Sequence, residues 1–397
     1  MRAPASPRHT RPLSPFALIL ALAAAPAIGL GIARFAYALV LPDMRADLGW
    51  SWADAGWMNT TNAFGYLAGA LLAARTIDRW GAGRTMLGGA IACTLSLALC
   101  AGLRDAALLN GARVLAGFGG GFAFVAGGVL AAGVAAREPA RSSLLLGIFY
   151  AGPGLGIALS GLVVPGTLAL AGPGSWPLAW GLLAAVSLPL TGALILGLRA
   201  DTVTGTRRGA KVSLVRDMRF LLAGYALFGA GYIAYMTFMI AWVRDGDGTA
   251  TEQGLFWSTI GLAAMASPWL WARVLGHGRH GHAFALLCAI TALGTALPLV
   301  SDSSWALFGS GALFGCAFFA VVASTTAFVR RNVPPPAWGR AIGTLTVSFG
   351  VGQTLGPVAI GALNDALGGL AGGLAISSGL LLLGAGIGLL QRDRMAA

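Results

Sequence analysis

The chain has 397 residues, of which 57% are hydrophobic and only 10% are charged. Soluble globular domains have about 45 to 50% apolar and about 25% charged residues, so this composition excludes an ordinary water-soluble protein. The net charge of +12 could point to nucleic acid, but most of the basic residues lie between the apolar runs, and this pattern removes the support for that class of partner.

Twelve apolar runs follow one another along the chain, and a helix needs roughly 20 such residues to cross a bilayer. Charged or Pro/Gly-rich breaks separate the runs. The first run continues well past a segment like a signal peptide, so we expect an uncleaved first helix. The runs cover residues 16–40, 55–74, 85–103, 106–128, 144–169, 176–198, 220–242, 254–272, 283–300, 305–329, 338–363 and 368–390.

The longest polar stretch, residues 199–219, follows the sixth run and divides the chain into two halves. We therefore expect a tail at 1–15, a six-helix bundle at 16–198, a linker at 199–219, a second bundle at 220–390 and a tail at 391–397. Of the 26 Lys and Arg residues, 21 lie in the tails, the linker and alternate loops. Cytoplasmic loops carry such an excess, so the pattern predicts that both termini are cytoplasmic.

The second and third runs are joined by the sequence Asp78-Arg79-Trp80-Gly81-Ala82-Gly83-Arg84. This segment resembles the D-R-x-G-x-R/K motif of the major facilitator superfamily. The resemblance implies that Asp78, Arg79, Gly81 and Arg84 form a conformational latch, in which a carboxylate pairs with basic groups and a helix end. The alternative is a basic loop that only sets the topology.

Arg34 lies inside the first run, in Ala33-Arg34-Phe35-Ala36-Tyr37, and helical spacing places it on one face with Tyr37. The sequence R-F-A-Y followed by L-P-x-M is similar to the first helix of the bacterial YbfB-type branch of the superfamily, which implies the bacterial inner (plasma) membrane. A charge inside a membrane segment usually has a function, so Arg34 is predicted to face a cavity. The alternative is a structural tie to a backbone carbonyl or to Asp54.

Arg113 lies in the fourth run, where the sequence from Arg113 to Gly121 is similar to the R-x-x-x-G-x-G element of the superfamily. A buried arginine normally faces a polar interior or a partner. The alternative is that Arg113 extends past Asn110 toward water at the helix end.

Polar side chains recur in both halves, where they either bond between helices or contact a solute. Asn59, Asn62 and Tyr66 share one face of the second run. The residues predicted to bind the substrate are Arg34, Tyr37, Asn59, Asn62, Tyr66, Arg113, Tyr232, Tyr235 and Gln353.

Glycine and proline occur together in the fifth run, at Gly152, Pro153 and Gly156, and in the eleventh run, at Gly356 and Pro357. Small residues allow close contact between helices and proline favours a bend, so these residues are predicted to serve packing and bending. The fifth run also looks like a motif of superfamily exporters, although packing alone explains its glycines.

No Asp or Glu lies in the middle of any run. Asp54 is therefore the predicted site for a coupling proton, and uncoupled facilitated diffusion is the alternative. His277, His280 and His282 are close in sequence, but a solvated loop is expected there rather than a metal site. The sequence has no nucleophile with an ordered base and no phosphate-binding loop, so we expect neither an enzyme nor a cofactor.

These features together predict the all-α major facilitator fold, with twelve transmembrane helices in two six-helix bundles. The resemblance implies a monomeric secondary transporter that binds a small molecule, contacts membrane lipids and works by alternating access. Two embedded arginines without embedded acids favour an organic anion as substrate. The alternatives are an exporter of neutral or amphipathic compounds and a non-transporting membrane sensor.

Overall fold

The computed structural model describes residues 13–200, 218–277, 280–334 and 337–393, so the predicted linker and both tails lie largely outside it. The described residues form helices and contain no strand. The helices are α1 (Pro15–Pro26), η1 (Ala27–Phe35), α2 (Tyr37–Leu48), α3 (Trp52–Trp80), α4 (Ala82–Gly102), α5 (Ala106–Ala136), η2 (Pro139–Arg141), α6 (Ser142–Ala171), α7 (Trp176–Ala200), α8 (Arg219–Asp245), α9 (Ala250–Leu270), α10 (Ala272–His277), α11 (His282–Val300), α12 (Ser304–Asn332), α13 (Trp338–Leu367) and α14 (Leu370–Leu389).

The twelve predicted runs each fall on a long helical segment. Ten of these segments are apolar and long enough to cross a membrane, the first being the continuous span Pro15–Leu48 formed by α1, η1 and α2. The other two are α3 and α9, which have 29 and 21 residues. The membrane-spanning all-helical architecture is therefore confirmed, although the first helix extends eight residues beyond the predicted end at residue 40.

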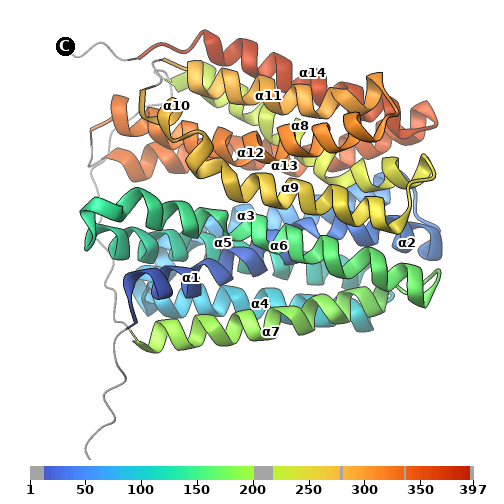
Figure 1. The fold of residues 1–397 in the computed structure, drawn as a ribbon, viewed down its shortest axis with the longest axis horizontal. Helices are drawn as coiled ribbons and strands as arrows, with labels where there is room; N and C mark the ends of the chain where they lie inside the picture. Colours follow the sequence, from blue (N-terminus) through green and yellow to red (C-terminus); the bar gives the residue numbers. More distant parts are fainter. Residues whose placement is uncertain (1–12, 201–217, 278–279, 335–336, 394–397) are drawn as a thin grey trace, which may run out of the picture.

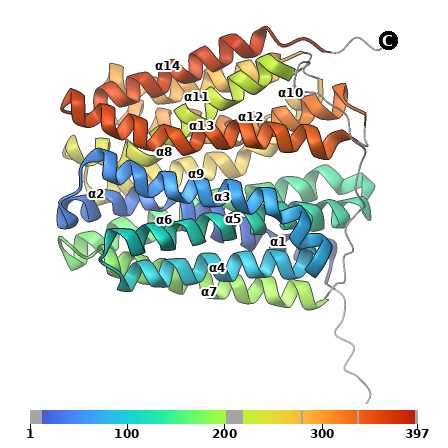
Figure 2. The same ribbon diagram turned by 180° about the vertical axis from the view of Figure 1, so that it is seen from behind.

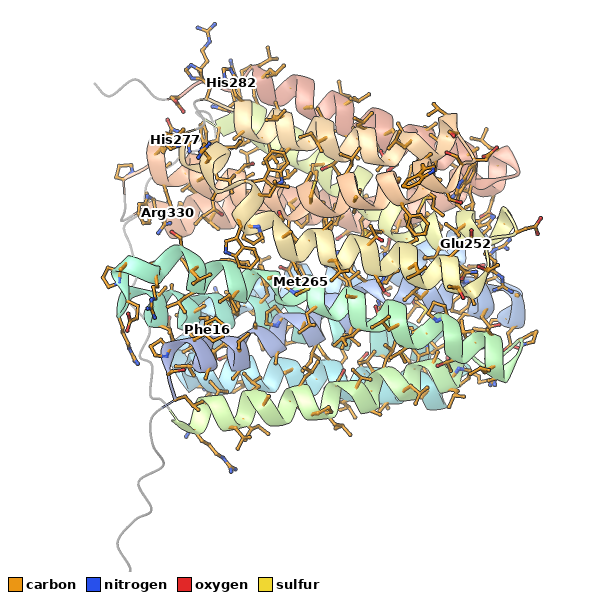
Figure 3. All side chains as sticks on the ribbon, in the orientation of Figure 1. Phe16, Glu252, Met265, His277, His282 and Arg330 are labelled. Carbon is orange, nitrogen blue, oxygen red and sulfur yellow. The ribbon has the colours of Figure 1, made fainter. Side chains whose placement is uncertain are left out.

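The helices form two groups, α1 to α7 and α8 to α14, which lie side by side in both views (Figures 1 and 2). α1 begins and α14 ends at the same end of the molecule, which we call the terminal end; the opposite end, where α3 begins and α13 ends, is the far end. The labelled polar residues Glu252, His277, His282 and Arg330 lie at these two ends (Figure 3). Large apolar side chains such as Leu162 of α6 and Leu188 of α7 are exposed along the helices, as expected for a surface that faces lipid.

The middle of the first span is a π-helix of nine residues, Ala27–Phe35, and all nine are buried. π-helices are rare and occur mostly as single turns, often at functional sites. Close contacts fix this segment in the bundle, because a Cβ atom on Gly31 would lie only 2.5 Å from the Cα atom of Gly156. No pattern in the sequence indicates this π-helix.

The two halves meet along α6 and α9, where glycines allow the backbones to touch. A Cβ atom on Gly154 would lie 2.5 Å from the carbonyl oxygen of Gly261, and one on Gly161 would lie 2.9 Å from that of Gly254. The glycines of α6 that were predicted to pack, Gly152 and Gly156, form contacts within the first half instead. Gly152 and Gly156 face the carbonyls of Ala23 and Ala27, and so hold α6 against α1 and η1 within the first half.

The second contact between the halves joins α3 to α13, which run in opposite directions. A Cβ atom on Gly56 of α3 would lie 2.2 Å from the carbonyl oxygen of Pro357 of α13. The neighbouring Gly356 faces Ala230 of α8, within the second half. A Cβ atom on Gly361 would lie 2.3 Å from the carbonyl oxygen of Trp52. The closest α3–α13 contacts thus lie toward the far end.

The predicted loop between the second and third spans is shorter than expected. Asp78 and Arg79 belong to the last turn of α3, and Gly81 alone separates α3 from α4. Gly81 has a φ of +84°, which favours glycine and allows this tight connection. Arg84 then lies in the first turn of α4.

We expect the α6–α9 contact to be sensitive to a single methyl group. Gly154→Ala should lower the melting temperature of the purified protein, because its Cβ atom would clash with the Gly261 carbonyl. The matched control is Gly166→Ala on the same helix, where a Cβ atom meets nothing within 4 Å. That variant should be neutral or stabilising by about 0.5 to 1 kcal/mol, since alanine favours helix. Equal melting temperatures for both variants would contradict the close contact.

Candidate functional site

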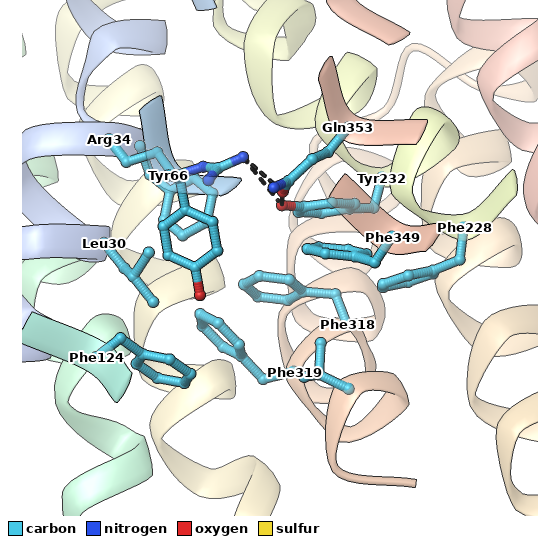
Figure 4. A pocket seen from close by; sticks show the side chains of 12 residues that line it. Leu30, Arg34, Tyr66, Phe124, Phe228, Tyr232, Phe318, Phe319, Phe349 and Gln353 are labelled. Atoms are coloured by element: carbon cyan, nitrogen blue, oxygen red, sulfur yellow. Dashed lines mark hydrogen bonds between the residues drawn. The ribbon is translucent and has the colours of Figure 1, made fainter. Parts of the chain in front are cut away.

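A cavity lies between the two halves (Figure 4). Its walls come from η1, α3 and α5 of the first half and from α8, α12 and α13 of the second. Eight of its twelve lining residues are aromatic. The lining residues are Leu30, Arg34, Phe35, Tyr66, Phe124, Phe228, Tyr232, Phe318, Phe319, Val322, Phe349 and Gln353.

Arg34 supplies the charge in this cavity, and its side chain is buried at 3% exposure. Its Nη2 atom donates to Oε1 of Gln353 at 2.7 Å and lies 3.5 Å from the hydroxyl of Tyr232 (Figure 4). The guanidinium carbon lies 5.1 Å from the ring centroid of Tyr66, a cation–π distance. Arg34 therefore connects the first half to the second through neutral partners.

Two buried donors at this point have no hydrogen-bond partner, namely Nε of Arg34 and Nε2 of Gln353. Oε1 of Gln353 is already shared, because the Tyr232 hydroxyl also donates to it at 3.1 Å. The predicted alternative tie from Arg34 to Asp54 is wrong. Unpaired buried donors are costly, and they favour a ligand that brings an acceptor group.

The aromatic wall opposite Arg34 comes mainly from the second half. Phe228 and Tyr232 lie one turn apart on α8 and stack at 5.1 Å, and Tyr232 stacks on Phe349 of α13 at 5.4 Å. Phe318 and Phe319 of α12 complete this wall. Sequence reasoning missed all of these phenylalanines, although the four-residue spacing from Phe228 to Tyr232 and from Phe349 to Gln353 could have indicated a common face.

Arg113 does not line the cavity, contrary to the prediction, and it does not reach water either, because it is fully buried. Its guanidinium donates to the backbone carbonyls of Ala33 and Arg34, at the end of the π-helix. The rings of Tyr37 and Trp180 lie 5.2 and 5.5 Å from its guanidinium carbon. Arg113 thus fixes the backbone that carries Arg34 and acts as a positioning residue.

Other predicted binding residues also lie outside the cavity lining, because their polar atoms bond elsewhere in the bundle. Tyr37 donates to the carbonyl of Ala55 at 2.8 Å, and Asn62 donates to the carbonyl of Arg113 at 3.1 Å. Tyr235 shares a 2.6 Å hydrogen bond with Ser310 of α12. The structure therefore brings Arg34, Tyr66, Tyr232 and Gln353 together at the cavity. Tyr37, Asn62 and Tyr235 instead form contacts within one half.

Asn59 lies between the cavity and the far end, and Asp54 lies at the far end, in the first turn of α3. Nδ2 of Asn59 donates to Thr237 of α8 at 2.6 Å, which is a direct contact between the halves. Asp54 is exposed and forms a capping box with Ser51 at the start of α3. The predicted proton site is thus a helix cap outside the cavity.

Comparisons with known proteins agree with this architecture. The family model described as "Uncharacterised MFS-type transporter YbfB" matches residues 26–389. The chain is 26% identical to a chloramphenicol resistance protein of Streptomyces lividans over 389 residues, which cover 92% of this chain and 95% of that protein.

Solved transporter structures show the same fold at low sequence identity. A bacterial homologue of the human lysosomal transporter Spinster, in an inward-facing and unoccupied conformation, has a TM-score of 0.69 at 13% identity and covers 95% of this chain and 97% of its own. The nucleoside transporter NupG, as a D323A mutant, has a TM-score of 0.67 at 14% identity, with 94% and 97% covered.

Replacement of Arg113 tests its role as a positioning residue. Arg113→Ala leaves the carbonyls of Ala33 and Arg34 without their donor, so we expect a loss of about 2 to 4 kcal/mol of stability, seen as a lower melting temperature. The control is Arg104→Ala, which breaks the exposed pair with Asp47 and should cost at most about 1 kcal/mol. Similar melting temperatures for both variants would remove the assigned role.

Proposed function

We propose that this chain, which belongs to the YbfB-type family of major facilitator superfamily transporters, carries amphipathic organic anions with an aromatic body across the membrane by alternating access. The observation that carries the proposal is Arg34, a buried guanidinium in an aromatic cavity whose partners are neutral. The family and fold are those of transporters rather than enzymes.

The proposed substrate class follows from the two kinds of group that line the cavity, namely the guanidinium of Arg34 and the aromatic rings. A guanidinium within a membrane costs about 2.5 to 3.5 kcal/mol on insertion scales, and the neutral oxygens of Gln353 and Tyr232 compensate it only in part. A carboxylate or a similar anionic group completes the pairing, since Arg presents a fork of donors. The rings around it would stack on an aromatic body. An amphipathic anion is the solute that uses both walls.

Gln353 occupies the position that the anionic group of the substrate would take. Its Oε1 atom lies 2.7 Å from Arg34 across the boundary between the halves. A bound anion would compete for Arg34 and so loosen a tie between the halves. This competition supports a link between binding and conformational change.

Transport of a neutral or amphipathic compound out of the cell is the second candidate. It is supported by the relative in Streptomyces lividans, whose name refers to chloramphenicol resistance, because export of a toxic compound confers resistance. The largely aromatic cavity accepts such a compound as well. The two candidates differ in whether Arg34 is needed for binding.

The remaining parts of the proposal concern orientation and the latch. The excess of arginines supports a terminal end in the cytoplasm and a multi-pass protein of the bacterial inner membrane, with bundles at 16–198 and 220–390. Asp78, at the cytoplasmic end of α3 in this orientation, is proposed to latch the terminal end in one conformation. Coupling to a proton is a further hypothesis, and Asp54 stays its candidate. The protein is proposed to act as a monomer.

The binding of anions can be tested through thermal stability. Aromatic carboxylates, the corresponding neutral amides, cations and sugars are added to the purified protein, and a ligand at a hundred times its dissociation constant adds about 2.7 kcal/mol. We expect the carboxylates to stabilise the wild type, Arg34→Lys to weaken binding about tenfold, and Arg34→Ala to abolish the effect. Arg104→Ala, an exposed arginine outside the cavity, is the control. Stabilisation of both the wild type and Arg34→Ala by neutral compounds alone would favour the neutral exporter.

Gln353→Glu tests the competition at Arg34. The new carboxylate would form an ion pair with Arg34 inside the protein. Added anions could then not compete for Arg34, so they should no longer raise the melting temperature. The control is Gln253→Glu, the same change of side chain on α9 outside the cavity lining, which should respond to anions like the wild type. A normal anion response in Gln353→Glu would show that the ligand binds elsewhere.

A further inference from the structure

The start of α3 is capped by both halves of the protein. The first N–H groups of a helix have no partner within the helix and need other acceptors. The N–H of Asp54 donates to Oγ of Ser51 at 3.0 Å, within α3 itself. The N–H groups of Trp52 and Ala53 donate to the two carboxylate oxygens of Asp365, each at 2.8 Å.

Asp365 belongs to the last turn of α13, in the second half. Its carboxylate forms charge-assisted hydrogen bonds and lies at the positive end of the α3 dipole, and both effects stabilise the contact. The backbones must be very close for these bonds to form. Gly361, one turn earlier on α13, provides this closeness because a Cβ atom there would lie 2.3 Å from the carbonyl oxygen of Trp52.

Other bonds between the halves lie between this cap and the cavity. Asn59 donates to Thr237, and the hydroxyl of Thr60 donates to the carbonyl of Thr354 at 2.7 Å. The far end of the cavity is thus closed by several layers of contacts, and the cap by Asp365 is the outermost.

We propose that Asp365 is a gate residue, which holds the far end closed by capping α3 across the boundary between the halves. When α3 and α13 separate at the far end, both bonds to Asp365 break and water replaces them. The capping box of Asp54 lies entirely within α3, so it stays intact during the same movement. Asp54 and Asp365 are both exposed acids that accept hydrogen bonds at the start of α3, but only Asp365 comes from the other half.

The gate can be tested without a known substrate, so the result is independent of the role of Arg34. Spin labels are placed on cysteines at Ala107 of α5 and Ser304 of α12, two exposed far-end positions in opposite halves. The four native cysteines are replaced first, and distances are measured by double electron–electron resonance in lipid nanodiscs. Gly361→Ala serves as the positive control, because its Cβ atom forces the far end apart.

We expect Asp365→Ala to raise the ratio of long to short distances about three- to tenfold over the unmutated reporter chain, the scale of a lost helix cap. Asp365→Asn keeps the shape and one acceptor, so it should give a smaller increase and covers the case in which Asp365→Ala does not fold. Asp54→Ala should keep the distances of the reporter chain.

Two results would overturn the gate. One is an unchanged distance distribution in the folded Asp365 variants while Gly361→Ala lengthens it. The other is an equal lengthening in Asp54→Ala, which would assign the effect to charge at the helix end rather than to the contact between the halves.

Discussion

The burial of two guanidinium groups in an apolar bundle is the constraint on which the site depends. Neither Arg34 nor Arg113 has an acidic partner among the described residues, so each must find oxygen atoms elsewhere. Arg113 takes backbone carbonyls of the π-helix in its own half. Arg34 takes side-chain oxygens of the other half. Only the contacts of Arg34 can therefore change when the halves move.

The π-helix η1 links the contacts of Arg113 to those of Arg34, because it carries both the carbonyls that Arg113 binds and the side chain of Arg34. Arg113 holds the carbonyl of Arg34, and Asn62 in turn donates to the carbonyl of Arg113, so α3, α5 and η1 form one polar network. The side chain of Arg34 leaves this network and reaches Gln353 across the cavity. A rigid backbone on one side and an exchangeable partner on the other is the arrangement that preorganised binding requires.

The sequence predicts the spans and the class of fold, because an apolar run can be recognised within each segment without knowledge of its neighbours in space. It also selects Arg34, Tyr66, Tyr232 and Gln353, since a polar group in a membrane segment stands out against apolar neighbours. Arg113 stands out equally, yet its partners are carbonyls of a π-helix that no local pattern indicates. The phenylalanines of the cavity resemble ordinary core residues, and the cap by Asp365 depends on the register between two distant helices.

The two ties between the halves differ in how they can be broken. The tie at Arg34 has a neutral acceptor and unpaired donors beside it, so under the proposed function an anion in the cavity would compete with Gln353 for Arg34. The cap at Asp365 already gives the N–H groups of Trp52 and Ala53 an anionic acceptor, so a second anion would gain little by replacing it. The layer formed by Asn59 and Thr237 also separates the cap from the cavity. Binding would therefore loosen the inner tie first, and the outer cap would set the cost of the opening that follows.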